Sequence, residues 1–286
     1  MWYYKGEVGD CMVELSEEIL EEVILKRKQE SHKGTYGRVV LIGGNEQYGG
    51  AIILGASAAV HSGAGLVSVV SDKKNHSSLH ARLPEAMTLG FDDCIDEVIV
   101  DADVIGVGSG LGLSDESLVI LKKVLTKVEE EQWLIIDGSA ITLFAKNELT
   151  LKYPHKTIFT PHEMEWQRLS GIEIAKQSVE VSQNVVNKLG CTAIVKSHQT
   201  KIFIPNREPY FLTIGTPAQA TGGMGDVLVG ILSAFLAQFK QDSIKSICAG
   251  VYLHSLIASK LALDSYVVLP SKLIDSIPTY MKKYSI

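Results

Sequence analysis

The strongest chemical signal in the sequence is a glycine-rich turn, residues 215–226, which is followed by the apolar run 227–232. Glycines directly before a helix let several backbone N–H groups converge on one anion, and the positive end of the helix dipole adds to the attraction. Asp226 would repel a bound phosphate, but its carboxylate is useful if it accepts the proton of a hydroxyl group that attacks a phosphoryl group. The alternative is a tight turn in which Asp226 only satisfies first-turn N–H groups, and the glycine pattern alone leaves both open.

Two further glycine clusters follow predicted strands. One comprises residues 43–45 and 49–51, and the other is residues 106–112, whose spacing does not fit the dinucleotide-binding fingerprint. No Walker A motif occurs in the sequence. Clusters at the ends of strands indicate a crevice in which the backbone approaches a ligand closely, although two ordinary strand-to-helix turns would have the same pattern.

Polar side chains follow two more strands. His162 and Glu165 lie where a strand turns into a helix, on one helix face, and as an isolated pair they are more typical of a helix start than of a site. Residues 196–200 could hold an adenine or a ribose, or form a solvated turn. His61 and His254 lie in small-residue or apolar helical patterns, and we expect both to be packed without a functional role.

The elements that must position these residues follow an alternating pattern. Near-continuous apolar runs separated by helical patterns are typical of a mostly parallel sheet covered on both faces, so we predict a doubly wound α/β fold. The predicted strands are residues 38–42, 66–70, 104–107, 134–137, 157–160 and 192–196, and the predicted helices include residues 114–131, 173–189, 223–238 and 243–263. The uncharged stretch 47–71 mixes glycine and serine with apolar residues, so we expect a turn, a helix and a strand there, not a membrane span.

Two short runs, residues 201–204 and 210–213, flank a proline-bounded turn and predict an antiparallel hairpin added to the sheet. No repeat or linker divides the 286 residues, so we expect a single domain over residues 1–286, with residues 1–30 as an N-terminal helical extension.

Composition excludes several classes of protein. The formal net charge is −6 and no long basic run occurs, which argues against nucleic acid as a main partner. The four cysteines lack the spacing of a zinc or redox motif, so we expect free thiols in a reducing compartment, the cytoplasm.

Taken together, these segments resemble the NAD(P)H-hydrate dehydratase family, a branch of the ribokinase-like superfamily. The resemblance covers almost the whole chain beyond about residue 30, in the family's order. It is carried by residues 31–37, 49–51, 84–86, 108–112, 136–137, 160–162, 222–226 and 252–254. The sequence departs from the family pattern at Thr216, at Met224 and at residues 163–164, which bears on side-chain contacts more than on the reaction.

The resemblance implies repair of hydrated NADH and NADPH: a nucleotide phosphorylates the C6 hydroxyl of the S epimer, and phosphate then leaves. Asp226 would be the base, and the N–H groups of the anion hole would come from Gly222, Gly223, Met224 and Gly225. The substrate contacts would be Ala51, Gly110, His162 and Asp226, and the nucleotide contacts would be Lys196, Ser197, His198, Gln199, Thr200 and Gly225.

The resemblance also implies partners. Glu165, with Asp137 as a second candidate, matches the acidic position linked to magnesium and its water shell. ADP is favoured over ATP as the phosphoryl donor, and a homotetramer is expected. We expect no epimerase domain before the matched region, so a separate epimerase or spontaneous epimerisation would convert the R hydrate.

Two other functions stay open from the residues alone. A small-molecule alcohol kinase of the same superfamily, of the hydroxyethylthiazole kinase kind, would keep Asp226 and the anion hole but release a phosphorylated product. A non-catalytic nucleotide-binding protein on this fold would gain nothing from a carboxylate beside the phosphate.

Overall fold

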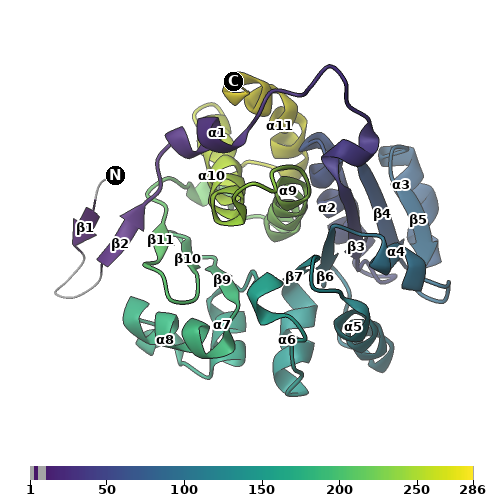
Figure 1. The fold of residues 1–286 in the computed structure, drawn as a ribbon, viewed down its shortest axis with the longest axis horizontal. Coiled ribbons are helices and arrows are strands. Elements are labelled where there is room, and N and C mark those ends of the chain that lie inside the picture. Colours follow the sequence, from purple (N-terminus) through teal and green to yellow (C-terminus); the bar gives the residue numbers. More distant parts are fainter. Residues whose placement is uncertain (1–2, 6–10, 286) are drawn as a thin grey trace.

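The computed structural model describes residues 3–5 and 11–285, and their strands form one eleven-stranded sheet (Figure 1). The strand order is β1-β2-β11-β10-β9-β8-β7-β6-β3-β4-β5. The strands are β1 (Tyr3–Lys5), β2 (Cys11–Glu14), β3 (Arg38–Ile42), β4 (Leu66–Ser71), β5 (Met87–Gly90), β6 (Val104–Val107), β7 (Trp133–Ile136), β8 (Thr157–Phe159), β9 (Thr192–Val195), β10 (Lys201–Phe203) and β11 (Tyr210–Phe211). The α-helices are α1 (Glu18–Val23), α2 (Gly49–His61), α3 (His76–Arg82), α4 (Asp96–Val100), α5 (Asp115–Lys127), α6 (Gly138–Lys146), α7 (Glu163–Ser170), α8 (Val179–Leu189), α9 (Met224–Gln238), α10 (Ser243–Leu261) and α11 (Pro270–Tyr284).

The seven strands from β9 to β5 are parallel, which confirms the predicted α/β class. Strand β3 pairs with β4 on one side and with β6 on the other, so the strand order reverses at this point. Open parallel sheets bind ligands outside the carboxyl ends of their strands at such a reversal. The carboxyl edge beside β3 and β6 is therefore where a site is expected.

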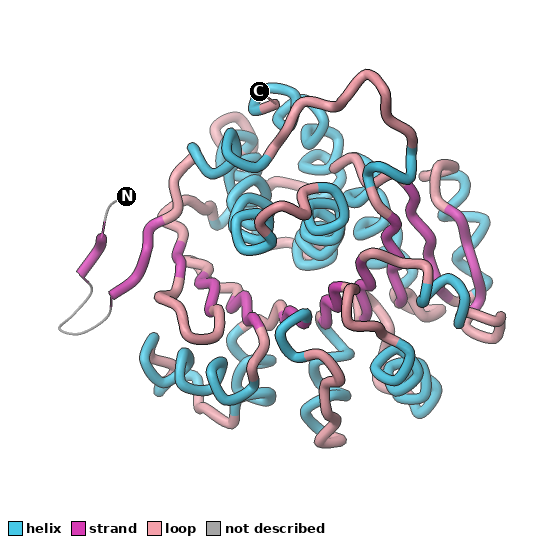
Figure 2. The backbone as a smooth tube through the Cα atoms, viewed as in Figure 1, coloured by secondary structure: helices cyan, strands magenta, loops and turns pink. Residues whose placement is uncertain are grey.

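Helices cover both faces of the sheet (Figures 1 and 2). Side chains alternate along β3: Val39 and Leu41 join the core under α2, α9 and α10, whereas Val40 and Ile42 join the core under α5 and α6. Because successive side chains of a strand point to opposite faces, a strand buried on both sides must be apolar throughout. This explains the unbroken apolar runs in the sequence.

Helices α2 and α9 approach each other closely at two glycines. A Cβ atom on Gly230 of α9 would lie 2.1 Å from the backbone oxygen of Gly55 in α2, far inside contact distance. Glycine is thus required at position 230, because any side chain there would push the two helices apart. The close packing fixes the amino end of α9 relative to the sheet.

The predicted hairpin is confirmed, since β10 pairs antiparallel with both β9 and β11. The prediction of a helical extension over residues 1–30 is wrong for residues 3–5 and 11–14, which form the strands β1 and β2. The segment β2 pairs parallel with β11, and only the six residues of α1 are α-helical among the described residues before position 31. Backbone hydrogen bonds attach β2 to β11, because the N–H groups of Val13 and Leu15 donate to Pro209 O and Phe211 O.

Two predicted helices are shorter than expected. The pattern 173–189 becomes a short 3₁₀ turn and then α8, because the Ser178 side chain accepts from the Val181 N–H and starts a new helix. The pattern 114–131 becomes α5, which ends at Lys127. In the part of the chain that the structure describes, no helix is long and apolar enough to cross a membrane.

Candidate active site

The loops after β3 and β6 are joined by backbone hydrogen bonds at the carboxyl edge of the sheet. The N–H of Gly44 donates to Ser109 O at 2.8 Å, and the N–H of Asn45 donates to Gly110 O at 2.8 Å. Gly110 has a φ of +63°, and a Cβ atom there would lie 3.0 Å from the Cβ of Ala51. The structure thus brings together Ala51 and Gly110, the two smallest residues among the predicted substrate contacts.

The residue before α9, Gly223, has no side chain that could cap the first-turn N–H groups, and of these groups the Asp226 N–H interacts with the Asp226 carboxylate. Gly223 precedes the helix with a φ of +99°, a conformation that glycine adopts without strain. The turn before it is anchored from outside, because the N–H of Val268 donates to Ala218 O at 2.8 Å. Unsatisfied first-turn N–H groups together with the helix dipole make this end of α9 suited to an anion.

Asp226 lies in the first turn of α9, and its pKa is raised from 3.8 to about 6. Burial is the main cause, and the negative charge of Asp137 adds to it. The Ser109 hydroxyl and the Lys196 ammonium act in the opposite direction. A carboxylate with a pKa of about 6 is half protonated near that pH, and it is a stronger base than an ordinary aspartate.

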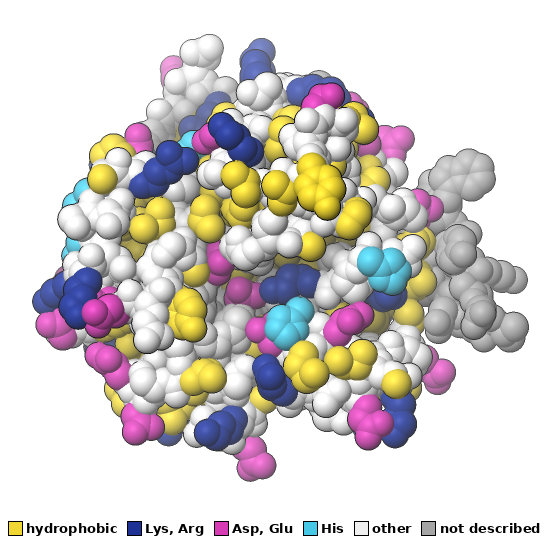
Figure 3. Space-filling view, turned by 180° about the vertical axis from the view of Figure 1, so that it is seen from behind, with side chains coloured by type: hydrophobic (Ala, Val, Ile, Leu, Met, Phe, Trp, Pro, Cys, Tyr) yellow, Lys and Arg dark blue, Asp and Glu magenta, His cyan; other side chains and the backbone are white. Residues whose placement is uncertain are grey.

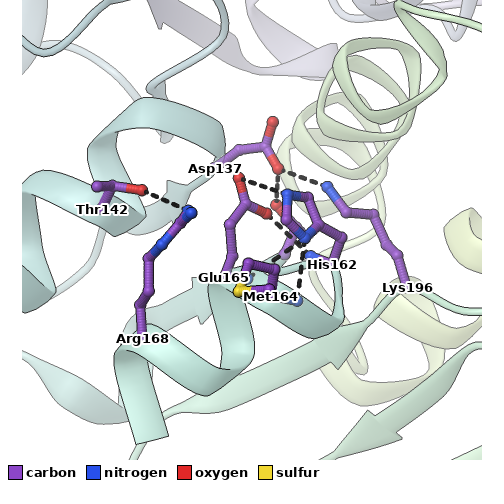
Figure 4. Close-up of polar contacts among 8 residues, drawn as sticks. Asp137, Thr142, His162, Met164, Glu165, Arg168 and Lys196 are labelled. Carbon is purple, nitrogen blue, oxygen red and sulfur yellow. Dashed lines mark hydrogen bonds and ion pairs between the residues drawn. The ribbon is translucent and has the colours of Figure 1, made fainter. Parts of the chain in front are cut away.

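A partly buried ion pair joins Asp137 and Lys196 (Figure 4), and both charges act on the pKa of Asp226. Lys196 Nζ donates to Asp137 Oδ1 at 2.9 Å, and Thr160 Oγ1 donates to the same oxygen at 2.6 Å. Burial alone would lower the pKa of Lys196, but the carboxylates of Asp137 and Glu165 raise it above its ordinary value. The ammonium therefore stays charged.

His162 and Glu165 start helix α7 together (Figure 4). His162 Nδ1 accepts from the N–H groups of Met164 and Glu165, and Glu165 Oε2 accepts from the His162 N–H at 2.9 Å. This reciprocal arrangement is a capping box, so the helix-start interpretation of the pair is confirmed. The His162 side chain is still 53% exposed, and His162 pairs with Lys196 in a single parallel bridge, which puts it at the same edge.

The predicted nucleotide-binding turn continues from Lys196. Ser197 Oγ donates to Gln199 O at 2.8 Å, and Thr200 Oγ1 donates to Ser197 O at 3.5 Å, so the turn is held by its own polar groups. His198 and Gln199 are exposed. A ligand at this turn would meet exposed polar side chains and backbone groups.

The acidic residues fit a magnesium ion that is held mainly by other ligands. Among the described residues, no group of three or more His, Cys, Asp or Glu side chains could hold a metal. Asp137 Oδ1 already accepts two hydrogen bonds, and Glu165 Oε2 accepts one. Magnesium in nucleotide sites is bound by one or two carboxylates, with phosphate oxygens and water as its other ligands. Asp137 and Glu165 could supply the carboxylates.

Two residues beside the site were not singled out from the sequence. Thr160 donates to Asp137, and the buried Ser109 hydroxyl acts on Asp226. Thr160 directly follows β8 and Ser109 lies two residues after β6, so their position at the carboxyl edge was a signal that could have indicated them. His254, for which no role was expected, is buried, and burial lowers its pKa to about 4.

The surface of the molecule is hollowed in more than one place. The space-filling view from behind has a hollow near the middle of the molecule, where acidic, basic and histidine side chains lie together (Figure 3). A cavity of about 810 Å³ lies elsewhere, lined by the carboxyl ends of α2 and α9, at Val60 and Gln238. It includes none of the predicted site residues.

Comparisons with known proteins agree with the family resemblance of the sequence. The family model described as NAD(P)H-hydrate dehydratase matches residues 39–279. An ADP-dependent (S)-NAD(P)H-hydrate dehydratase from Lactococcus lactis is 59% identical over 96% of this chain and 99% of the relative. A protein of the same name from Enterococcus faecalis is 54% identical over 95% of this chain and 93% of the relative.

Comparison with solved protein structures also supports this family. A ribokinase-like superfamily protein from Enterococcus faecalis matches with a TM-score of 0.94 and 54% identity, over 96% of each chain. An ADP/ATP-dependent NAD(P)H-hydrate dehydratase from Bacillus subtilis, co-crystallised with ATP and Mg²⁺, matches with a TM-score of 0.84 and 26% identity, over 96% of this chain and 99% of that one. With its ribokinase-like fold and a family match over most of its length, the chain belongs to the NAD(P)H-hydrate dehydratase family.

Proposed function

We propose that this chain dehydrates the S epimer of hydrated NADH and NADPH in a reaction driven by ADP. The observation that carries the proposal is the position of Asp226, a carboxylate with a pKa of about 6 in the first turn of a helix whose N-cap residue, Gly223, has no side chain. Relatives that are 46–59% identical bear the name ADP-dependent (S)-NAD(P)H-hydrate dehydratase, which supports the proposal.

In the first step, Asp226 accepts the proton of the C6 hydroxyl. The oxygen then attacks the β-phosphorus of ADP, a new P–O bond forms, and AMP leaves with the electron pair of the broken bond. The N–H groups of residues 222–225 hold the transferred phosphoryl group through hydrogen bonds that its charge strengthens.

In the second step, the C6–O bond breaks. Hydroxide is a poor leaving group, and phosphorylation converts it into phosphate, which leaves readily. The lone pair of the ring nitrogen supplies the electrons that expel phosphate, which leaves an iminium at N1 and C6. Loss of a proton from C5 to solvent then restores the C5–C6 double bond of the reduced nicotinamide. This sequence explains why a lyase would retain a kinase-like base and anion hole.

The substrate and the nucleotide would occupy neighbouring parts of the carboxyl edge. Ala51 and Gly110, which lie close to each other, would contact the nicotinamide half, and His162, which pairs with Lys196 at the same edge, would be a further substrate contact. Residues 197–200 would contact the nucleoside. When bound, magnesium would neutralise charge on the phosphate oxygens, with Asp137 and Glu165 ordering its water shell.

The proposal also covers the oligomeric state, a second enzyme that supplies the substrate, and the cellular compartment. We include a homotetramer, for which the exposed Leu263, Tyr266 and Leu269 offer apolar surface, and a separate epimerase that supplies the S epimer. The free thiols of Cys94, Cys191 and Cys248 fit a reducing compartment, so we include the cytoplasm.

The test is a turnover measurement with hydrated NADH, magnesium and either ADP or ATP. We expect the ultraviolet absorbance of NADH to appear with ADP, with one phosphate released for each NADH formed. A smaller rate with ATP would support the choice of donor. Formation of a stable phosphorylated product without free phosphate would instead identify an alcohol kinase and contradict the proposal.

A further inference from the structure

The ammonium group of Lys196 lies against the amino end of α9 and apart from the turn that follows it. A Cβ atom on Gly225 would lie 3.1 Å from Lys196 Nζ and 3.9 Å from Asp137 Oδ2. Gly225 belongs to the first turn of α9, whose N-cap residue, Gly223, has no side chain. The side chain of Lys196 is therefore beside the predicted anion hole, whereas Ser197 bonds within its own turn.

Three neighbouring strands hold this ammonium in place. Asp137 follows β7, Thr160 follows β8 and Lys196 follows β9, and these strands are neighbours. One carboxylate oxygen of Asp137 accepts hydrogen bonds from both Lys196 and Thr160. The Lys196 N–H donates to Pro161 O at 2.8 Å, which fixes the start of the lysine side chain. The Asp137 side chain is 5% exposed and that of Lys196 is 23% exposed. Such a pair is far more restrained than an ion pair on the surface.

The ammonium carries two costs that an anion would relieve. A cation beside the positive end of a helix dipole is repelled, and a partly buried ammonium loses hydration, although the carboxylates of Asp137 and Glu165 outweigh that loss. A phosphoryl group in transfer removes both problems, because its negative charge is spread over three equatorial oxygens. A lysine ammonium is a compact charge that suits phosphate.

We propose that Lys196 is a catalytic residue that contacts the phosphoryl group during its transfer, and that Asp137 and Thr160 are positioning residues that hold its ammonium there. This inference rests on the proposed function. Lys196 keeps its proton throughout. The bond between the β-phosphorus of ADP and its bridging oxygen breaks, the bond to the C6 oxygen forms, and Asp226 takes the hydroxyl proton.

The direct test compares Lys196→Met with the matched surface variant Lys176→Met, which removes one exposed lysine that pairs with Glu173 and is not among the predicted site residues. We expect Lys196→Met to lower kcat about 10²- to 10³-fold, as for the loss of an oxyanion-hole donor, and to change the Kd for ADP by less than about threefold. Lys176→Met should match the wild type. Lys196→Arg keeps the charge and should recover part of the lost kcat.

The role of Asp137 is tested through Lys196. Asp137→Asn retains a hydrogen-bond acceptor but removes the counter-charge, and we expect kcat to fall about tenfold. In the Lys196→Met background the same change should have almost no further effect, because Asp137 acts through the lysine. An equal loss in both backgrounds, or recovery with excess magnesium, would contradict the positioning role. The double variant also avoids a lone buried charge, should Lys196→Met fail to fold.

A binding measurement separates this inference from the proposed function. Aluminium fluoride with AMP is a planar mimic of the phosphoryl group in transfer and needs no hydrated NADH. We expect the wild type to bind this pair at least about tenfold more tightly than Lys196→Met does, whichever alcohol is the substrate. Equal binding, or a normal kcat with the Kd for ADP raised about tenfold, would make Lys196 an ordinary nucleotide contact and overturn the inference.

Discussion

At the scale of single residues, the raised pKa of Asp226 lowers the stability of the folded protein and favours the proposed role of Asp226 as a base. Burial and the charge of Asp137 raise its pKa to about 6, so the folded protein holds the ionised form at a cost in free energy above that pH. The same shift makes the carboxylate a better base near neutral pH. Functional carboxylates commonly show this opposition between stability and activity.

Replacement of Asp226 with Asn should separate the two effects. We expect turnover to fall about 10²- to 10⁴-fold because no base remains, while ADP still binds within about threefold of the wild-type Kd. Urea unfolding at pH 8 should show equal or greater stability, because the variant lacks the buried negative charge of Asp226. Near-normal turnover would remove Asp226 from the role of base.

The pH dependence follows from the same carboxylate. Asp226 must be deprotonated to act, and its pKa in the folded protein is about 6, so kcat/KM should fall as pH decreases below that value. The decrease should approach tenfold per pH unit, with circular dichroism recorded at each pH to show that the protein stays folded. A flat profile down to pH 5 would be incompatible with this base.

At the scale of elements, short-range motifs were readable from the sequence and long-range pairs were not. The capping box of His162 and Glu165 depends on residues three positions apart, and the pattern predicted a helix start there. The pair of Asp137 and Lys196 joins residues 59 positions apart, and it exists only because β7, β8 and β9 are neighbours. No local pattern could have predicted that contact.

Helix α7 gives a prediction about its cap. His162→Ala removes the acceptor for two first-turn N–H groups and should lower the free energy of unfolding by about 1 kcal/mol. His162→Asn should keep the stability, because asparagine is a preferred cap. Urea midpoints at an unchanged m-value check this difference. Equal loss in both variants would mean that the side chain does not cap the helix.

The contact between α2 and α9 gives a second prediction at this scale. Gly230→Ala would bring a Cβ atom to 2.1 Å from Gly55 O and 2.7 Å from the Cβ of Ala58, so the helices must separate. We expect a loss of about 1–3 kcal/mol in urea unfolding, despite the higher helix propensity of alanine. Gly50→Ala is the control, since no heavy atom lies within 4 Å of its Cβ position. If both variants were equally stable, the close approach would not be required.

At the scale of the whole molecule, the sequence was sufficient for the class of fold and for the edge that holds the site. Apolar runs such as 104–107 and glycine clusters after them predicted a parallel sheet with a ligand crevice at its carboxyl ends. The attachment of β2 to β11 was missed, because the pairing partner lies almost 200 residues away and neither strand has a distinctive pattern. Strand order had to come from the structure.

The central claim is that the chain converts the C6 hydroxyl into a phosphate before the hydroxyl oxygen leaves, and oxygen-18 tracing tests it most directly. Hydrated NADH labelled with oxygen-18 at the C6 hydroxyl would be converted with unlabelled ADP, and the released phosphate would be analysed by mass spectrometry. We expect one labelled oxygen in each phosphate, because the P–O bond formed in the first step survives the second. Unlabelled phosphate, with the label in water, would contradict the claim.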